Sequence, residues 1–136
     1  MSLKRSEARI IAMTILYQIN LCEKNKINYD KEEIISNNLE VDNEFVRLLV
    51  NGVIDNLLEI DNLANKYLGT WPINRLGIND QAIFRLAIYE LKYMDTPKIV
   101  AINEAIELAN MYSDEKISKM LNGVLDNIYH NEVDSE

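Results

Sequence analysis

The stretch VAINEAIELANMY (Val100–Tyr112), followed by KMLNGVLDNI (Lys119–Ile128), decides the fold of this chain. In both segments apolar residues recur at steps of three and four, the period of an α-helix with one buried face. Between them they also carry Asn, Glu and Gly where plain core helices would have Leu or Ala. The pair therefore predicts a specific packing of helices. Because neither segment holds a nucleophile, a metal-ligand cluster or a phosphate loop, the pattern is typical of a binding module.

The composition predicts a single cytoplasmic domain over residues 1–136. Hydrophobic residues make up 48% of the chain, and only four Gly and two Pro interrupt it, so we expect an all-α core. No apolar run reaches the roughly 18 residues of a membrane span, and no signal-peptide core is present. Cys22 and His130 are each the single residue of their kind, which excludes an internal disulfide and a structural zinc site. We expect no metal, no cofactor and no membrane contact.

The positions of helices follow from apolar periodicity and from breakers. Periodicity predicts helices over residues 4–22, 30–37, from 45 to just before 69, 79–93, 98–112 and 115–131. Pro72 disfavours helix at Trp71, so GTWPINRLG (Gly69–Gly77) is the one clear boundary, with a short helical turn at 74–76. It separates an N-terminal half, about 1–69, from a C-terminal half, about 70–136. The segment 79–93 is apolar on several sides, which predicts a central helix.

A short sequence repeat, called here the internal echo, occurs once in each half. LVNGVIDNL (Leu49–Leu57) matches MLNGVLDNI (Met120–Ile128) at Asn, Gly, Val, Asp and Asn. A glycine inside a helix costs roughly 1 kcal/mol relative to alanine. We therefore expect both Gly52 and Gly123 to permit close contact between helices.

Positive charge is concentrated at the amino end of an acidic protein. The net charge is −8, yet Lys4, Arg5 and Arg9 all fall within the first ten residues. Arg5 and Arg9 lie one helical turn apart, and cations at a helix start oppose its dipole, which hints at an external anion. We expect both guanidinium groups to be open to solvent. An ordinary solvated helix start is the alternative interpretation.

Enzymatic motifs are missing from the sequence. No Ser/His/Asp or Cys/His constellation and no nucleotide-phosphate loop occurs. Glu104 and Glu107 are best interpreted as the flank of a helix. Polar residues inside the central helix form either an internal network or a patch for another protein, and burial favours the network.

Six motifs together resemble the NusB family of transcription antitermination factors. They are the R-x-x-x-R start with LYQ (Leu16–Gln18), FVRLLVNGV (Phe45–Val53), W-x-x-x-R-L (Trp71–Leu76), D-x-A-I-x-R-L-A-x-Y-E-L (Asp80–Leu91), VAINEAIELA (Val100–Ala109) and NGVLD (Asn122–Asp126). The resemblance implies an all-α NusB-like bundle of about seven helices in two halves, three plus four. It also implies a non-catalytic factor that binds single-stranded boxA RNA of ribosomal RNA leaders together with the ribosomal protein NusE, within an RNA polymerase antitermination complex.

The resemblance implies two sets of site residues. The residues that match RNA-binding positions of the family are Lys4, Arg5, Arg9, Tyr17, Lys119 and Met120. Asp80 matches the position that faces NusE, with Arg85, Tyr89 and Glu90 as nearby partner-binding candidates. Met120 stands where the family has a Phe, which removes a ring on which a base could stack. Contacts to three to five phosphates would give a slope of log K against log salt of about −2 to −3.5.

Three alternatives stay open. A protein-interaction scaffold with little direct RNA binding would also fit the small basic end. Self-association as a homodimer, as in some family members, would cover Arg5 and Arg9. A NusB-like accessory domain of an RNA cytosine methyltransferase needs an attached methyl-donor-binding domain, for which we expect no room in this chain.

Overall fold

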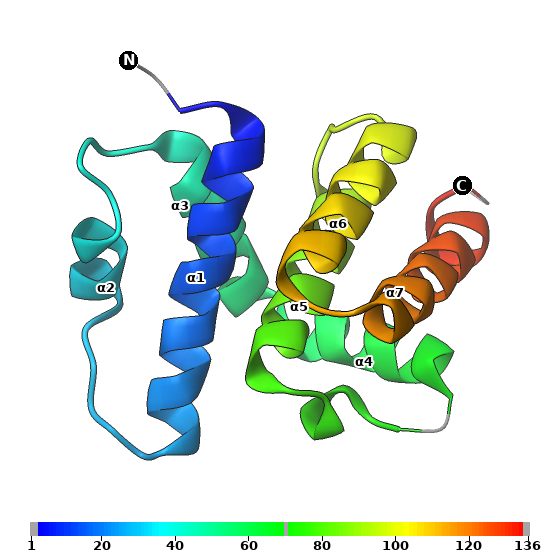
Figure 1. Ribbon diagram of the computed structural model, residues 1–136, viewed down its shortest axis with the longest axis horizontal. Coiled ribbons are helices and arrows are strands. Elements are labelled where there is room, and N and C mark those ends of the chain that lie inside the picture. Colours follow the sequence, from blue (N-terminus) through cyan, green and yellow to red (C-terminus); the bar gives the residue numbers. More distant parts are fainter. Residues whose placement is uncertain (1–2, 70, 135–136) are drawn as a thin grey trace.

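The computed structural model describes residues 3–69 and 71–134, and every regular element in those ranges is helical (Figure 1). The α-helices are α1 (Arg5–Lys24), α2 (Lys31–Asn37), α3 (Glu44–Asp55), α4 (Leu57–Leu68), α5 (Ile78–Tyr93), α6 (Lys98–Tyr112) and α7 (Glu115–Ile128). A short 3-10 turn, η1 (Ile73–Arg75), precedes α5, and a π-helical turn, η2 (Tyr129–Val133), follows α7. The predicted all-α fold is confirmed. None of the described helices combines the length and the apolar character needed to cross a membrane.

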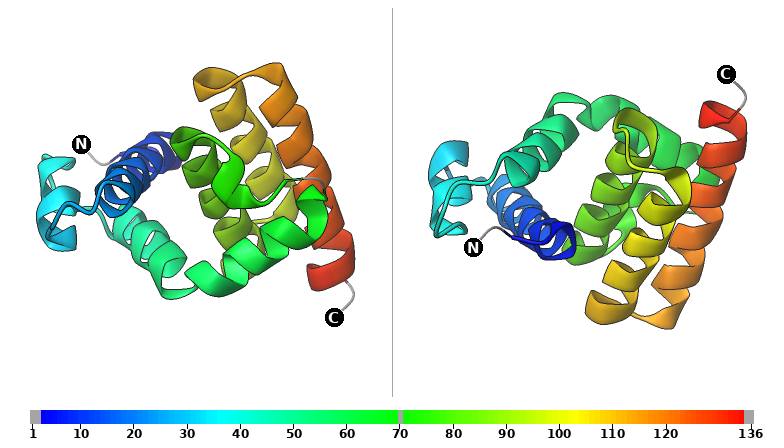
Figure 2. Two further views of the ribbon diagram at one scale, coloured as in Figure 1. Left: turned by 90° about the horizontal axis from the view of Figure 1, so that it is seen from below. Right: turned by 90° about the horizontal axis from the view of Figure 1, so that it is seen from above.

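Helix α5 is the centre of the molecule, as its apolar sides predict. It packs against α1, α3, α4, α6 and α7, and Phe84, Ile88 and Leu91 are fully buried along it. The pair α6 and α7 lies on one side of α5, and α1 with α3 lies on the other (Figure 2). The short helix α2 contacts α1 at the outer edge of the molecule. This packing fixes the start of α1 close to the turn between α5 and α6.

The single helix expected up to Gly69 is wrong, because the chain breaks at Asn56. The backbone of Asn56 has φ −118° and ψ 21°, outside the helical range. Its side-chain amide and its backbone N–H both donate to the Gly52 carbonyl oxygen. An Asn side chain competes in this way with regular helical bonding. After the break, α4 packs against α5 and α7, while the division into halves near residue 69 stays a prediction.

Short polar side chains start three of the helices. Asp30 accepts a hydrogen bond from the Glu32 N–H, and Asn43 accepts one from the Val46 N–H. Asp114 does the same for the Ile117 N–H at the start of α7. Such caps satisfy backbone donors that have no partner within the helix. At the start of α3 the capping residue is therefore Asn43.

The two glycines of the internal echo have different surroundings. A Cβ atom built on Gly52 would lie 2.0 Å from Cζ of Tyr89, so α3 and the Tyr89 ring are in direct contact there. A Cβ atom on Gly123 would meet nothing within 4 Å. Close contact is therefore confirmed at Gly52 and wrong for Gly123, whose helix position faces open space.

The carboxyl-terminal turn is held to α4 by Glu132. Its carboxylate accepts a hydrogen bond from Lys66 Nζ at 2.8 Å and another from the Tyr67 hydroxyl. These bonds, first from Lys66 and then from Tyr67, lower the pKa of Glu132 below its ordinary value. A carboxyl whose folded pKa is lowered stabilises the folded state above its ordinary pKa, and this contribution is lost as pH falls through the lowered value.

We expect Glu132→Gln to destabilise the protein at pH 7 and to have a smaller effect at pH 3. As the pH falls toward the lowered pKa of Glu132, a growing fraction of the wild-type carboxyl is protonated, so the stabilities of the two proteins approach each other. Urea unfolding of both proteins at the two pH values measures this difference. Glu40→Gln, which changes an exposed carboxylate without a described partner, is the matched control. An effect of Glu132→Gln that does not depend on pH would contradict the assignment.

Candidate functional site

The start of α1 presents the free positive charge of the amino end. Lys4 is the N-cap residue, and its backbone N–H donates to Glu7 Oε1 at 3.1 Å. The Arg5 guanidinium carbon lies 4.4 Å from the centroid of the Phe45 ring. Both Lys4 and Arg5 are exposed, and neither side chain forms an ion pair within residues 3–69 and 71–134. The Phe45 ring, on α3, therefore packs against this arginine at the surface while its charge stays available.

Arg9 is in a different environment, and the expectation of an open guanidinium is wrong for it. Only 5% of Arg9 is exposed. Its Nε and Nη2 atoms donate to the two carboxylate oxygens of Glu90 at 2.8 and 2.6 Å. Glu90 also accepts a hydrogen bond from the Thr96 hydroxyl at 2.9 Å. A second carboxylate, that of Glu104, lies 3.7 Å from Arg9 Nη1.

This cluster joins three elements through one buried arginine. It connects α1 to the end of α5, to the α5–α6 turn and to α6. The hydrogen bonds to Glu90 raise the pKa of Arg9, although burial opposes them, so the guanidinium stays charged. A buried bidentate pair of this kind fixes geometry, because removal of one partner leaves an uncompensated charge. Arg9 thus positions the helix start that carries Lys4 and Arg5.

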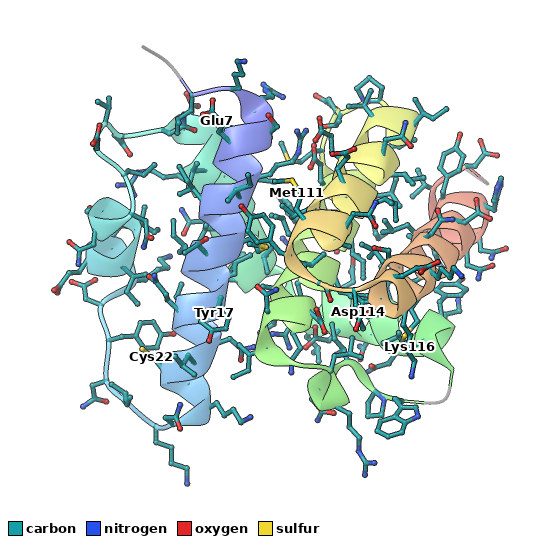
Figure 3. All side chains as sticks on the ribbon, viewed as in Figure 1. Glu7, Tyr17, Cys22, Met111, Asp114 and Lys116 are labelled. Atoms are coloured by element: carbon teal, nitrogen blue, oxygen red, sulfur yellow. The ribbon has the colours of Figure 1, made fainter. Side chains whose placement is uncertain are left out.

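The other predicted RNA-binding residues lie away from this helix start. Tyr17 is 37% exposed and sits further along α1, roughly 18 Å from Arg5 along the helix axis (Figure 3). Lys119 is exposed on α7 and pairs with Glu115 at 3.2 Å. Met120 is half-buried and packs against the core. Because α6 lies between α1 and α7, the structure does not gather these side chains into one pocket.

Most of the candidates for partner binding form contacts with other residues of the same chain. Arg85 donates to both carboxylate oxygens of Asp61, at 2.9 and 3.0 Å. Tyr89 is buried and stacks on Tyr93, with ring centroids 5.2 Å apart. Glu90 is the buried partner of Arg9. The internal network expected for the central helix is therefore confirmed, while a role of these residues in partner binding stays a prediction.

Asp80 is the candidate that keeps a partly exposed carboxylate. It accepts a hydrogen bond from the Ser113 hydroxyl at 2.6 Å. The neighbouring Asn79 donates to the Tyr112 carbonyl oxygen at 2.9 Å. Together these bonds hold the α6–α7 loop against the start of α5, and they make this corner a rigid part of the surface.

Two residues of the basic end were not singled out from the sequence. In the sequence Phe45 is only the first residue of a family motif, and Thr96 lies between the segments expected to be helical, 79–93 and 98–112. Their roles depend on contacts between distant segments, for which the local pattern carries no signal. Among the described residues, no group of His, Cys, Asp and Glu could hold a metal ion.

Comparison with known proteins gives a consistent result. The model of the NusB family matches residues 6–130. The chain is 44% identical over 128 residues to the transcription antitermination protein NusB of Listeria monocytogenes serotype 4a, covering 93% of this chain and 96% of that protein. It is 39% identical over 127 residues to the protein of the same name from Bacillus cereus, with coverage of 93% and 97%.

Solved structures agree with the sequence relatives. The fold matches T. maritima NusB with a TM-score of 0.85 and 34% identity, over 98% of this chain and 95% of that one. It also matches a chain in a crystal structure of the antitermination factors NusB and NusE in complex with dsRNA. That match has a TM-score of 0.79 and 28% identity, over 93% and 96% of the two chains.

Proposed function

Because the chain belongs to the NusB family, whose members are transcription antitermination proteins and not enzymes, we propose that it binds boxA RNA of ribosomal RNA leaders together with NusE. The observation that carries the proposal is the family match over residues 6–130, with similarity along nearly the whole chain. A related NusB solved with NusE and RNA supports both partners. In this function the protein works in the cytoplasm, as part of an RNA polymerase antitermination complex.

The proposed RNA-binding residues fall into two groups, those that contact the RNA and one that holds the contacting residues in position. Lys4 and Arg5 contact phosphates, since their charges are exposed and have no described carboxylate partner. Tyr17 offers a half-exposed ring for stacking on an unpaired base. Lys119 adds a third cation on α7. Arg9 supports the site from the interior and does not itself touch RNA.

Asp80 is the residue that we assign to the contact with NusE. Its carboxylate is partly exposed, and hydrogen bonds of the α6–α7 loop hold it in place. The other three candidates have a supporting role. The intramolecular contacts of Arg85, Tyr89 and Glu90 keep α5 rigid beneath this surface.

We expect Arg5→Ala to weaken boxA RNA binding by the NusE complex and to reduce the slope of log K against log salt by about 0.7, the value for one phosphate contact on a single strand. Gel-shift titrations of boxA and scrambled RNA at several salt concentrations, with and without NusE, measure both quantities. Lys24→Ala removes a cation from the opposite end of α1 and is the matched control. An unchanged slope in Arg5→Ala would remove Arg5 from the RNA contacts.

A protein-interaction scaffold is the second candidate function. The observation that favours it is the pairing of Arg9 with Glu90, which leaves fewer free cations than the sequence suggests. The same titrations separate the two. If this chain binds NusE but adds no affinity or sequence preference for RNA, the scaffold is correct.

A further inference from the structure

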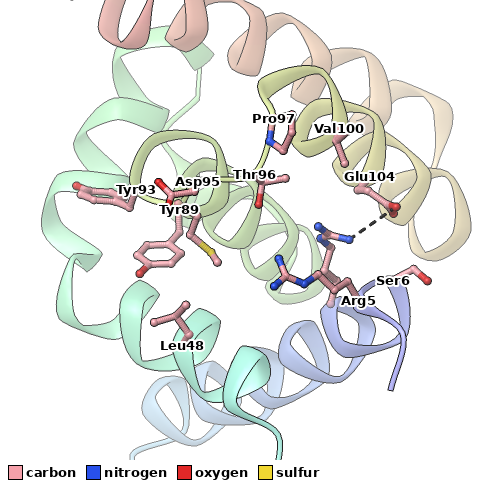
Figure 4. A pocket seen from close by; sticks show the side chains of 12 residues that line it. Arg5, Ser6, Leu48, Tyr89, Tyr93, Asp95, Thr96, Pro97, Val100 and Glu104 are labelled. Carbon is pink, nitrogen blue, oxygen red and sulfur yellow. Dashed lines mark ion pairs between the residues drawn. The ribbon is translucent and has the colours of Figure 1, made fainter. Parts of the chain in front are cut away.

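A cavity of about 750 Å³ lies between the start of α1, helix α3 and the turn from α5 to α6 (Figure 4). Small-ligand sites in proteins have volumes of about 300–1,000 Å³. The cavity is therefore large enough for a ligand of the size of a nucleotide. Its wall includes Arg5, which we assign above to phosphate binding, so it is continuous with the proposed RNA surface.

The two ends of the cavity have opposite charge. Figure 4 shows Asp95 beside Tyr93 at one end and Arg5, from α1, at the other, with the Ser6 hydroxyl turned outward. No hydrogen bond or ion pair of the Asp95 or Arg5 side chain occurs within the described parts of the chain. Glu104 also lines the cavity, but its carboxylate faces Arg9. Among the described residues of the lining, the charged groups without an ion pair are thus the Asp95 carboxylate and the Arg5 guanidinium, at opposite ends of the cavity.

Apolar side chains form the wall between these ends. Leu48, on α3, and Val100, on α6, are both exposed, and Met94 lies in the α5–α6 turn. A planar ligand can therefore pack against the apolar side chains in the middle of the cavity while its polar ends reach the charged groups at either end. The Phe45 ring packs against the Arg5 guanidinium beside the opening.

We propose that this cavity binds one unpaired nucleotide of the RNA strand. The phosphate lies at Arg5, the base packs on Leu48 and Val100, and an exocyclic amino group of the base donates to Asp95. The assignment rests on the proposed RNA-binding function. It favours cytosine, adenine or guanine over uracil, because uracil has no amino group to donate.

A basic side chain of a protein partner fits the same cavity less well. It could pair with Asp95, but Arg5 at the other end would repel it. A nucleotide carries N–H donors at one end and a negative phosphate at the other, which matches both ends. The charge distribution therefore selects a nucleotide over a basic peptide.

The test uses two tryptophan substitutions on neighbouring residues of α6. Val100→Trp fills the cavity from its wall. Ile99→Trp is the matched control, because Ile99 is 73% exposed and does not line the cavity. Cytidine and uridine 5′-monophosphates are titrated into each protein while the backbone amide signals of Ser6 and Thr96 are followed by NMR. We expect cytidine monophosphate to shift these signals more than uridine monophosphate does, in the wild type and in Ile99→Trp but not in Val100→Trp.

The second arm measures boxA RNA affinity in the presence of NusE. Val100→Trp is expected to lose about tenfold in affinity and Ile99→Trp less than about twofold, a contrast typical of the loss of one packed base. Equal affinity of the two variants, with no shift by either mononucleotide, would overturn the cavity assignment and leave the RNA function intact. Loss of NusE binding alone in Val100→Trp would overturn it in favour of a protein partner. Mononucleotide shifts in a protein that binds no RNA would refute the RNA function but keep the nucleotide site.

Discussion

Replacing Arg9 with alanine is expected to lower the free energy of unfolding by about 3–5 kcal/mol, because the Glu90 carboxylate is left buried without its partner. Glu90 is only 3% exposed, so water cannot replace the two hydrogen bonds that Arg9 donates. Thr96 would remain as a single neutral donor. Urea unfolding followed by circular dichroism measures the loss.

The matched control is Arg5→Ala, one helical turn earlier on the same helix. Arg5 is exposed and packs on one ring, an arrangement worth about 0.5–1 kcal/mol. We expect this variant to keep nearly full stability and to lose RNA affinity. Arg9→Ala should behave in the opposite way, with a large loss of stability. A stable Arg9→Ala protein that no longer binds RNA would make Arg9 a contact residue.

A double substitution separates charge from packing. Arg9→Met combined with Glu90→Leu removes both partners and leaves apolar side chains of similar size. We expect it to recover most of the stability lost in Arg9→Ala, since well-packed apolar residues often replace a buried ion pair without loss. Failure to recover would mean that the contact of Arg9 with Glu104, or the acceptor provided to Thr96, contributes more than the pair with Glu90.

The fold follows from the sequence wherever the determinant is local. Periodic apolar residues predict the helices, and Pro72 correctly predicts the irregular segment before α5. The break at Asn56 is harder to predict, because asparagine is tolerated inside helices. The break is visible only in the structure, where the Asn56 backbone leaves helical values and its side-chain amide also donates to the Gly52 carbonyl oxygen.

The site is less accessible to prediction because its members come from distant segments. Arg5 and Arg9 look equivalent in the sequence, four residues apart at the edge of one helical face. They differ in the structure because α5 brings Glu90 to Arg9 alone, although the Phe45 ring of α3 lies near both guanidinium groups. No local pattern carries the separation of 81 residues between Arg9 and Glu90. The resemblance to a family points to the start of α1, and the contacts show which of its two arginines is free of a carboxylate partner in the described parts of the chain.

Gly52→Ala is expected to lower the free energy of unfolding by about 1–3 kcal/mol, the usual cost of overpacking a core. The new Cβ atom would overlap the Tyr89 ring, which is buried and stacked on Tyr93. The rigid ring has to move as a unit, and Tyr93 is itself held by a hydrogen bond from its hydroxyl to Glu59. Thermal unfolding monitored by circular dichroism reports the change.

Two comparisons test that explanation. Gly123→Ala places the same methyl group at the equivalent position of the internal echo, where nothing lies within 4 Å. It is expected to stabilise the protein by up to roughly 1 kcal/mol, since alanine favours helix and restricts the unfolded chain. In a Tyr89→Leu background, Gly52→Ala should become neutral or stabilising, because the overlapping ring atoms are gone. If Gly52→Ala remains equally destabilising without the ring, the contact with Tyr89 is not the reason for glycine at this position.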